Sequence, residues 1–391
     1  MDGDTMVLDP DGDVVLVLDL KELASETVVD AASTDPSGHE MSADPSSEDV
    51  VGTTSTDSPD DKTPSADSSS DSLTVSISPT PEPKKIRFVV SSRHLSLASP
   101  VFKAMLRGNF QEGVKLKEAG KIEIPLPDDD SAAWKILLNI IHGQYMAIPL
   151  QLKLQVITQI AVLVDKYRMH EVVYLFVPTW RKAMDYPPTR WEDIISWICI
   201  SWVFELREEF RELTKKVQLD CVKTFESTIR FYNLDNLPIP QLVIDRIDAS
   251  RRKAIEKAFD ILGNTISQYQ KLIPNCNRDN SQPHLLVKGL ESHKRWCDIM
   301  VHGSLVRSAT LENIYPIPSA PYEWLSFSDL KSRIGRLEIV TACYMLMKNT
   351  KSDHQIHQTL IASTDSAGDE LVGLLLGVIK VDEMKPQCPT Q

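Results

Sequence analysis

Between residues 86 and 143, hydrophobic and polar residues follow a strand period and a helix period in turn, twice over. Ile86–Val90 and Lys121–Leu126 are short runs rich in β-branched residues, which predicts two strands. Residues 95–106 have apolar side chains at helical spacing. A second helix is predicted from residue 131, because four apolar side chains share one helix face: Trp134, Leu137, Leu138 and Ile141. A third helix is predicted over residues 152–167.

A further strand is predicted near the N-terminus, where Asp13–Leu18 follows the turn signal Asp9-Pro10-Asp11-Gly12. From about residue 25 to residue 83 the chain is then mostly Ser, Thr, Asp and Pro, and no aromatic residue occurs before Phe88. Such a segment cannot bury enough apolar surface to offset an ordering entropy of about 1–2 kcal/mol per residue. We therefore predict a long disordered acidic insertion over residues 21–84, placed between two strands of one domain.

The pattern stays helical beyond Tyr186-Pro187-Pro188, where we place a domain boundary. A long amphipathic helix is predicted over residues 242–272, and another over residues 330–347 with Ser328 as its N-cap. The predicted organisation is therefore a mainly α-helical C-terminal region over residues 186–350, followed by a weakly structured tail over residues 351–391.

The motif Leu95-x3-Ser99-Pro100-Val101-Phe102-x2-Met105-Leu106 resembles the BTB/POZ family. The resemblance covers residues 11–20 plus 85–175. The motifs are similar to those of a group of fungal BTB proteins that have a C-terminal helical region. It implies an α+β fold, a helical cluster capped by a small sheet. It also implies a non-enzymatic protein–protein interaction module, commonly a homodimer. Two features depart from the family pattern: Ser91 stands where members often have His, and the insertion interrupts an N-terminal region through which many members dimerise.

In family members that recruit the cullin scaffold of ubiquitin ligases, a hydrophobic-x-Glu triplet follows the Ser-Pro helix, and here Phe110-Gln111-Glu112 takes that place. An exposed aromatic ring can fill a pocket on a partner, and a carboxylate adds charge complementarity. The resemblance thus implies a substrate adaptor of a cullin-type ligase that uses Phe110 and Glu112. The alternative is that Phe110 packs locally and Glu112 is solvated, which would leave a scaffold or transcriptional cofactor without cullin binding.

Metal and enzyme motifs are poorly represented in the sequence. A calcium loop beginning at Asp9 would need residues other than Val14 and Leu20 at two positions. The nearest approach to a zinc set has irregular spacing and no Cys-x2–4-Cys pair; it consists of Cys276, His284, His293, Cys297 and His302. We expect these residues to be scattered, with no metal ligand and no cofactor. The acids Asp128–Asp130 are expected to cap a helix. No nucleophile and base can be named for catalysis, so we expect no enzyme activity, with a metal-binding or enzymatic C-terminal region as a remote alternative.

Charge is distributed unevenly along the chain. Residues 1–84 contain twenty acidic residues and three lysines, whereas the whole chain of 391 residues has a net charge of −13. The remainder is therefore close to neutral, which argues against direct nucleic-acid binding. No apolar run approaches the roughly 20 residues that span a bilayer, and the six cysteines form no paired framework. We expect an intracellular protein of the cytoplasm or nucleus that does not contact membranes.

The predicted insertion contains four Ser-Pro or Thr-Pro steps, which are candidate phosphorylation sites: Ser58, Thr63, Ser78 and Thr80. Each phosphate would add a charge of about −1.5 to −2 to a segment that is already acidic. We therefore expect any regulation by phosphorylation to act through this segment.

Overall fold

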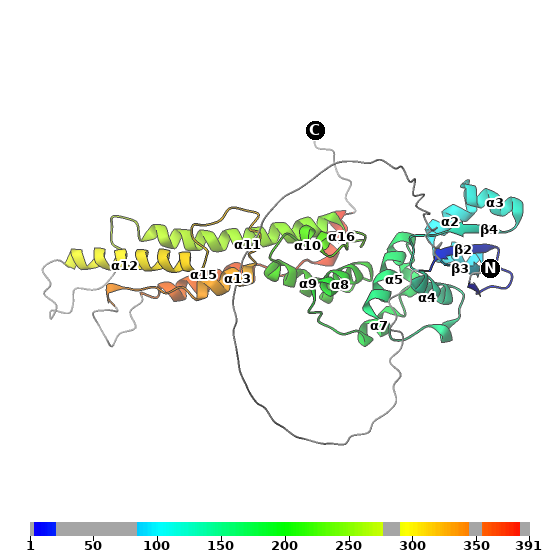
Figure 1. Ribbon diagram of the computed structural model, residues 1–391, viewed down its shortest axis with the longest axis horizontal. Coiled ribbons are helices and arrows are strands. Elements are labelled where there is room, and N and C mark those ends of the chain that lie inside the picture. Colours follow the sequence, from blue (N-terminus) through cyan, green and yellow to red (C-terminus); the bar gives the residue numbers. More distant parts are fainter. Residues whose placement is uncertain (1–3, 21–83, 277–289, 344–353, 384–391) are drawn as a thin grey trace, which may run out of the picture. The chain divides into compact units, whose positions relative to one another are not determined.

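The structure is a computed structural model that describes residues 4–20, 84–276, 290–343 and 354–383 (Figure 1). Its sheet has four strands: β1 (Thr5–Val7), β2 (Val14–Asp19), β3 (Lys85–Val90) and β4 (Ile122–Pro125). They lie in the order β1-β3-β2-β4. The pair β2–β3 is antiparallel, whereas β1 runs parallel to β3 and β4 runs parallel to β2. The three strands predicted from the sequence are confirmed, and the three-residue β1 is too short to show a period.

Five α-helices belong to the same domain: α1 (Ser92–Ala98), α2 (Pro100–Arg107), α3 (Gln111–Ala119), α4 (Ser131–Ile141) and α5 (Leu154–Tyr167). The single helix predicted over residues 95–106 is divided at Ser99 into α1 and α2, and α3 was not predicted. A short 3-10 helix, η1 (Tyr145–Ala147), joins α4 to the segment before α5. The buried residues of α4 include Trp134 and Leu137, as the helix period predicted. The predicted fold class, a helical cluster with a small sheet followed by a helical region, is confirmed.

The ends of the predicted insertion lie side by side in the sheet. Asp19 at the end of β2 is opposite Lys85 at the start of β3, and the Leu20 N–H donates to the Lys84 carbonyl at 2.7 Å. The insertion therefore joins two neighbouring strands of one sheet, as predicted. Residues 21–83 themselves lie outside the described residues.

Ten further helices are described after α5: α6 (His170–Val173), α7 (Val177–Ala183), α8 (Trp191–Val203), α9 (Arg207–Asp220), α10 (Phe225–Phe231), α11 (Gln241–Gln268), α12 (Leu290–Leu311), α13 (Phe327–Gly335), α15 (Ile356–Asp369) and α16 (Leu376–Glu383). The long helix predicted over residues 242–272 corresponds to α11. The helix predicted from residue 330 begins earlier, at α13, and it ends at Gly335. Its N-cap is Ser326, whose Oγ accepts from the Asp329 N–H at 3.0 Å, so the prediction of Ser328 was wrong.

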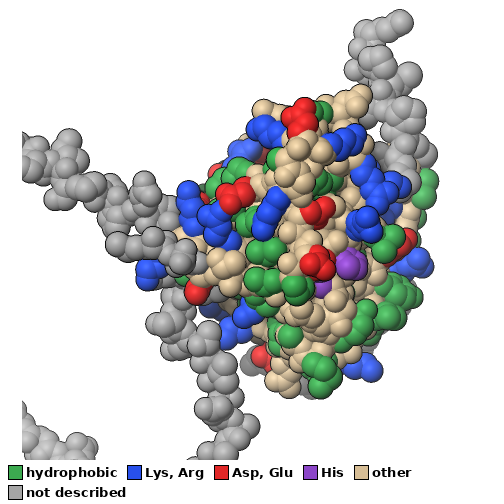
Figure 2. Space-filling model, turned by 90° about the vertical axis from the view of Figure 1, so that its right-hand side faces the viewer, with side chains coloured by type: hydrophobic (Ala, Val, Ile, Leu, Met, Phe, Trp, Pro, Cys, Tyr) green, Lys and Arg blue, Asp and Glu red, His purple; other side chains and the backbone are tan. Residues whose placement is uncertain are grey.

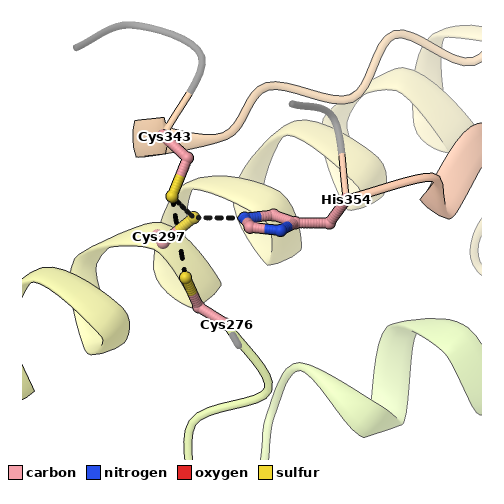
Figure 3. A group of neighbouring side chains, drawn as sticks. All are labelled: Cys276, Cys297, Cys343 and His354. Carbon is pink, nitrogen blue, oxygen red and sulfur yellow. Dashed lines mark hydrogen bonds between the residues drawn. The ribbon is translucent and has the colours of Figure 1, made fainter. Parts of the chain in front are cut away.

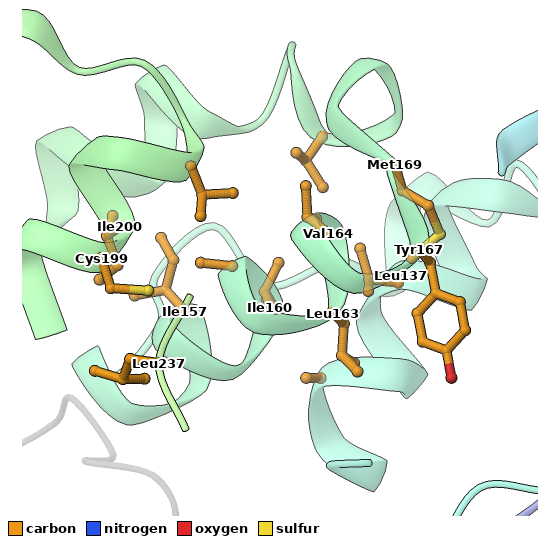
Figure 4. Packing of buried hydrophobic residues seen from close by; sticks show 14 of the residues in the cluster. Leu137, Ile157, Ile160, Leu163, Val164, Tyr167, Met169, Cys199, Ile200 and Leu237 are labelled. Carbon is orange, nitrogen blue, oxygen red and sulfur yellow. The ribbon is translucent and has the colours of Figure 1, made fainter. Parts of the chain in front are cut away.

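One hydrophobic core extends from the sheet into the helices that follow α5. Figure 4 shows the part of it around α5. In Figure 4, Ile157 and Ile160 of α5 lie between Leu137 of α4 and Cys199 of α8. Both faces of α5 are therefore buried, because one packs on the sheet-capped domain and the other packs on the helical region. The predicted boundary at residue 186 falls in the turn between α7 and α8, within this core.

A second core lies among α11, α12, α13 and α15. In the segment expected to be a weakly structured tail, the structure has the helices α15 and α16 instead. The buried face of α15 is Ile356, Leu360, Thr364 and Ala367. Thr and Ala occupy two of its inward positions, so the hydrophobic period is hidden in the sequence. Among the residues that the structure describes, none of the helices is long and apolar enough to cross a membrane.

Candidate functional site

The Ser-Pro step of the motif at residues 95–106 starts α2 and anchors it to α5. The Ser99 Oγ accepts a hydrogen bond from the Phe102 N–H at 3.1 Å and donates to the Tyr167 carbonyl at 2.6 Å. Pro100 follows at the first helical position, where the lack of an N–H costs nothing. Ser99 therefore caps α2 and also provides a hydrogen-bond donor for the last backbone carbonyl of α5. These two hydrogen bonds explain why a polar side chain is fully buried here.

A buried carboxylate organises the aromatic core behind this step. Asp129 is 4% exposed, and it accepts from the Trp134 Nε1–H at 2.9 Å and from the Tyr167 hydroxyl at 2.7 Å. The Lys166 ammonium donates to its other oxygen at 2.6 Å. Burial, followed by the hydrogen bond to Asp129, raises the pKa of the Tyr167 hydroxyl above its ordinary value. The Phe102 ring stacks on Tyr167 with centroids 4.9 Å apart, so α2, α4 and α5 meet at this carboxylate.

The close approach of α3 to the end of α2 depends on a glycine. A Cβ atom at Gly113 would lie 2.9 Å from the carbonyl oxygens of Leu106 and Gly108 and 3.0 Å from that of Met105. Backbone atoms cannot move aside as a flexible side chain can. Only glycine therefore lets α3 start where it does, and this start determines where Phe110 lies.

Phe110 and Glu112 lie at the exposed beginning of α3. Phe110 is the N-cap residue and is 60% exposed, and its carbonyl accepts from the Val114 N–H at 3.1 Å. Glu112 lies in the first turn and is half-buried. Val114, 41% exposed, adds apolar surface one turn further along. The aromatic ring therefore does not pack into the core, and ring and carboxylate are both accessible to a partner.

A second apolar surface lies around α1 and α6. A groove of about 590 Å³ is lined by Leu97, Ile140, Leu175 and Phe176, among others. Leu97 is 87% exposed and Leu175 is 80% exposed. A neighbouring groove of about 690 Å³ shares Leu175 and extends to the end of α8.

On the side of the molecule that carries β4 and α3, hydrophobic, basic and acidic side chains are mixed on the surface. Neither positive nor negative charge covers that face (Figure 2). Such a mixed surface suits protein partners.

The structure gathers cysteines that the sequence analysis expected to be scattered. Cys276 and Cys297 lie together with Cys343 and His354, neither of which belongs to the zinc set considered from the sequence (Figure 3). His293 borders this group, with its Nε2 3.3 Å from the Cys343 Sγ. The remaining two candidates are not part of it: His302 is hydrogen-bonded to Gln270 at 3.0 Å, and His284 lies outside the described residues. No local spacing signal could have found this group, because Cys297, Cys343 and His354 come from distant elements.

The acidic residues near the N-terminus form turns and caps. The Asp11 N–H donates to the Asp9 Oδ1 at 3.0 Å, and Asp13 accepts from the Ser92 N–H at 2.7 Å. Asp130 accepts from the Ala133 N–H at 2.8 Å, which confirms the cap predicted for the acidic run before α4. The four candidate phosphorylation sites lie outside the described residues: Ser58, Thr63, Ser78 and Thr80.

Comparison with known proteins agrees with this geometry. Residues 83–176 match the BTB/POZ domain family, a match that covers β3, β4 and the helices α1 to α6 but less than half of the chain. No curated protein matches the chain. Residues 83–176 are therefore a BTB/POZ domain, a protein-interaction fold and not a catalytic one. The strand β2, which lies before the matched segment, completes its sheet.

Proposed function

We propose that this chain is a substrate adaptor of a cullin-type ubiquitin ligase. In this account the BTB/POZ domain holds the cullin through Phe110 and Glu112, and the helical region that follows it holds the substrate. The observation that carries the proposal is the exposure of the Phe110 ring at the start of α3, 60% accessible where local packing would have buried it.

Energetics supports an anchor of this kind. Large aromatic side chains that enter a pocket on a partner commonly dominate the binding free energy of an interface, at about 2 kcal/mol or more each. Glu112 lies two residues from Phe110 and is half-buried, so its carboxylate can meet a basic side chain at the rim of the same contact. Val114 extends the apolar surface, and Gly113 holds this turn against α2.

Capture of the tagged protein from its own cells tests the proposal. Wild type should retain a cullin, and a Phe110→Ala, Glu112→Ala double variant should lose it. The matched control is Phe231→Ala, because Phe231 is equally accessible at 67% exposure but lies at the end of α10. A cullin absent from the wild-type sample, or retained by the double variant, would refute the adaptor proposal.

The second candidate function is a scaffold or transcriptional cofactor without cullin binding. The exposed side chains around α1 and α6 favour it, because Leu97 and Leu175 border an apolar groove that does not involve Phe110. The same face could serve a homodimer. Light scattering of a Leu97→Glu, Leu175→Glu variant separates the possibilities: a fall from dimer to monomer mass assigns the face to self-association. Partners lost at constant mass assign it to another protein.

Phosphorylation of the insertion is a separate regulatory proposal. Phosphates on Ser58, Thr63, Ser78 and Thr80 would add negative charge to the segment that joins β2 to β3 in the sequence. Mass spectrometry of protein from cells treated with phosphatase inhibitors should find phosphate on these residues. Unmodified residues under those conditions would remove the idea.

A further inference from the structure

Three thiols and one imidazole converge in a small cluster of their own. We call this group the cysteine–histidine cluster; its members are Cys276, Cys297, Cys343 and His354. One ligand atom from each lies within 4.8 Å of every other, and the three cysteines are buried. Figure 3 shows the side chains pointing toward one another from separate parts of the chain.

Three distances between ligand atoms in the cluster are close to those of a tetrahedral metal site. The Cys343 Sγ is 3.6 Å from the Cys276 Sγ and 3.9 Å from the Cys297 Sγ. The Cys297 Sγ is 3.3 Å from the His354 Nε2. Four ligands around zinc, with bonds of about 2.3 Å to sulfur and 2.0–2.1 Å to nitrogen, lie about 3.4–3.8 Å apart along the edges of the tetrahedron. The four ligand atoms are therefore close enough together to coordinate one ion. We propose that the cysteine–histidine cluster binds one Zn²⁺ ion.

The types and number of ligands indicate which metal binds at the cluster and whether its role is structural or catalytic. Three thiolates and one imidazole are soft and borderline ligands that select zinc over magnesium or calcium. Four protein ligands close the coordination sphere, which is the pattern of structural zinc; catalytic zinc keeps a position open for water or substrate. The site therefore serves the fold. It reverses the expectation, drawn from the irregular spacing in the sequence, that these residues hold no metal.

The packing around the cluster fits this structural role. The cluster is separate from the second core, and its buried partners are small: Ala342 beside the three cysteines, with Met300 packed against them. Little apolar area is available there to hold four chain segments together, so a metal can replace the missing core. One ion would tie the segment after α11 to α12, to residue 343 and to the start of α15.

Hydrogen bonding and backbone conformation next to the ligands help to position them. The Asn275 N–H donates to the Asp298 Oδ2 at 2.7 Å, which fixes the residue before Cys276 to the residue after Cys297. His354 has a φ of 56°, in the left-handed region that few non-glycine residues adopt. The residue with this backbone conformation is the one whose imidazole contacts the Cys297 sulfur.

His293 has a supporting place beside the cluster. Its Nε2 lies 3.3 Å from the Cys343 Sγ, and it comes from the first turn of α12, one turn before Cys297. An imidazole N–H at that distance can donate to a metal-bound thiolate, and such outer partners orient the ligand and lower its charge. His293 is thus a positioning residue for Cys343.

Metal analysis of the full-length protein tests the site. Protein expressed in zinc-supplemented medium and purified without chelator should contain one zinc per chain by inductively coupled plasma mass spectrometry. The apo protein reconstituted with Co²⁺ should show the intense visible absorption of tetrahedral cobalt with thiolate ligands. A chain without zinc whose cobalt form lacks that absorption overturns the proposal. A Cys276–Cys343 disulfide that blocks metal uptake in freshly purified protein also overturns it.

Matched variants exclude general unfolding as the cause of any loss. Cys297→Ser and His354→Ala should each reduce bound zinc and lower the melting temperature, and chelator should lower the wild-type melting temperature to a similar value. The controls are Cys199→Ala, which removes a buried thiol from the first core, and His302→Ala, which removes a histidine of α12 bonded to Gln270. Both should keep one zinc per chain. Equal zinc loss in these controls, or full zinc in the cluster variants, contradicts the assignment.

Discussion

Asp129 is a buried carboxylate that organises the aromatic core of the BTB/POZ domain. The sequence predicts a helix cap in the run Asp128–Asp130, and Asp130 does cap α4. Asp129 instead turns inward to Trp134 and Tyr167. Three consecutive acids look alike in a sequence, so the buried role of one of them emerges only from the packing.

Removing the Asp129 carboxylate should destabilise the domain strongly. The Asp129→Ala variant leaves the donors of Trp134, Tyr167 and Lys166 without their acceptor, at a cost of about 3–5 kcal/mol. Urea denaturation measures the change in the free energy of unfolding. Glu118→Ala, at an exposed position of α3, is the control and should change it by less than about 0.5 kcal/mol. Equal effects of the two substitutions would contradict this role of Asp129.

His142 should make the stability of the domain depend on pH. Burial lowers the pKa of the imidazole, opposed by the hydrogen bond to the Leu138 carbonyl. Its Nδ1 lies 2.9 Å from that carbonyl and its Nε2 accepts from the Ser91 N–H at 3.2 Å, an arrangement that requires the neutral ring. Because the folded pKa is below the unfolded value, stability is complete at neutral pH and falls as the pH drops below about 6.5.

The pH dependence can be assigned by substitution. Protonation of His142 should cost about 1 kcal/mol, the value of the hydrogen bond to Ser91 that is lost. Unfolding free energies of wild type and His142→Gln, compared between pH 7.5 and pH 5, measure this difference. His170, whose pKa burial also lowers, contributes equally to both proteins. The same slope in wild type and variant would show that His142 does not titrate on unfolding.

At the scale of elements, a buried arginine holds the loops that frame α11. Arg251 is 1% exposed, and its guanidinium donates to five carbonyls: Cys221 at 2.8 Å, Val222 at 3.2 Å, Pro321 at 3.3 Å, Tyr322 at 2.8 Å and Leu325 at 2.8 Å. The planar fork suits several acceptors at once. α11 thereby positions the two loops that contain these carbonyls.

Substituting Arg251 should loosen both loops at once. Arg251→Met removes the donors and leaves buried carbonyls without partners, at a cost of about 3 kcal/mol or more in the free energy of unfolding. Arg252→Met, on the exposed side of α11, is the matched control and should have little effect. Hydrogen exchange should rise in residues 221–222 and 321–325 in the first variant only. Unchanged exchange there would show that other contacts hold these loops.

At the scale of the whole molecule, the sequence predicted the elements better than their grouping. Period and turn signals predicted β2, β3, β4, α4 and α5, because each pattern is local. They predicted α1 and α2 as one helix over residues 95–106 and did not predict α3. Phe110 and Glu112 could be named as candidates because the family motif places them after α2. The cysteine–histidine cluster and the fold of α15 could not be predicted, because both depend on contacts between residues far apart and, in α15, on buried Thr and Ala.

The insertion should be dispensable for folding. Its ends meet at the β2–β3 pair, where Leu20 bonds to Lys84, so a short turn can join them. Replacing residues 21–83 with a short Gly-rich turn should leave the free energy of unfolding within about 1–2 kcal/mol, because loop-closure entropy varies slowly with length. Calorimetry measures this, and its control is a chain of full length in which the segment is replaced by a scrambled version of itself. Loss of the folding transition in the shortened chain would show that the insertion contributes to the core.

The most direct test of the central claim is the affinity of the purified chain for purified cullins of its own organism, measured by titration calorimetry. The account predicts that wild type binds one of them and that Phe110→Ala weakens binding at least tenfold, about 1.4 kcal/mol or more. Phe231→Ala, equally exposed on α10, should bind as wild type does. Wild-type protein that binds no cullin, or Phe110→Ala protein that binds as tightly as wild type, would contradict the account.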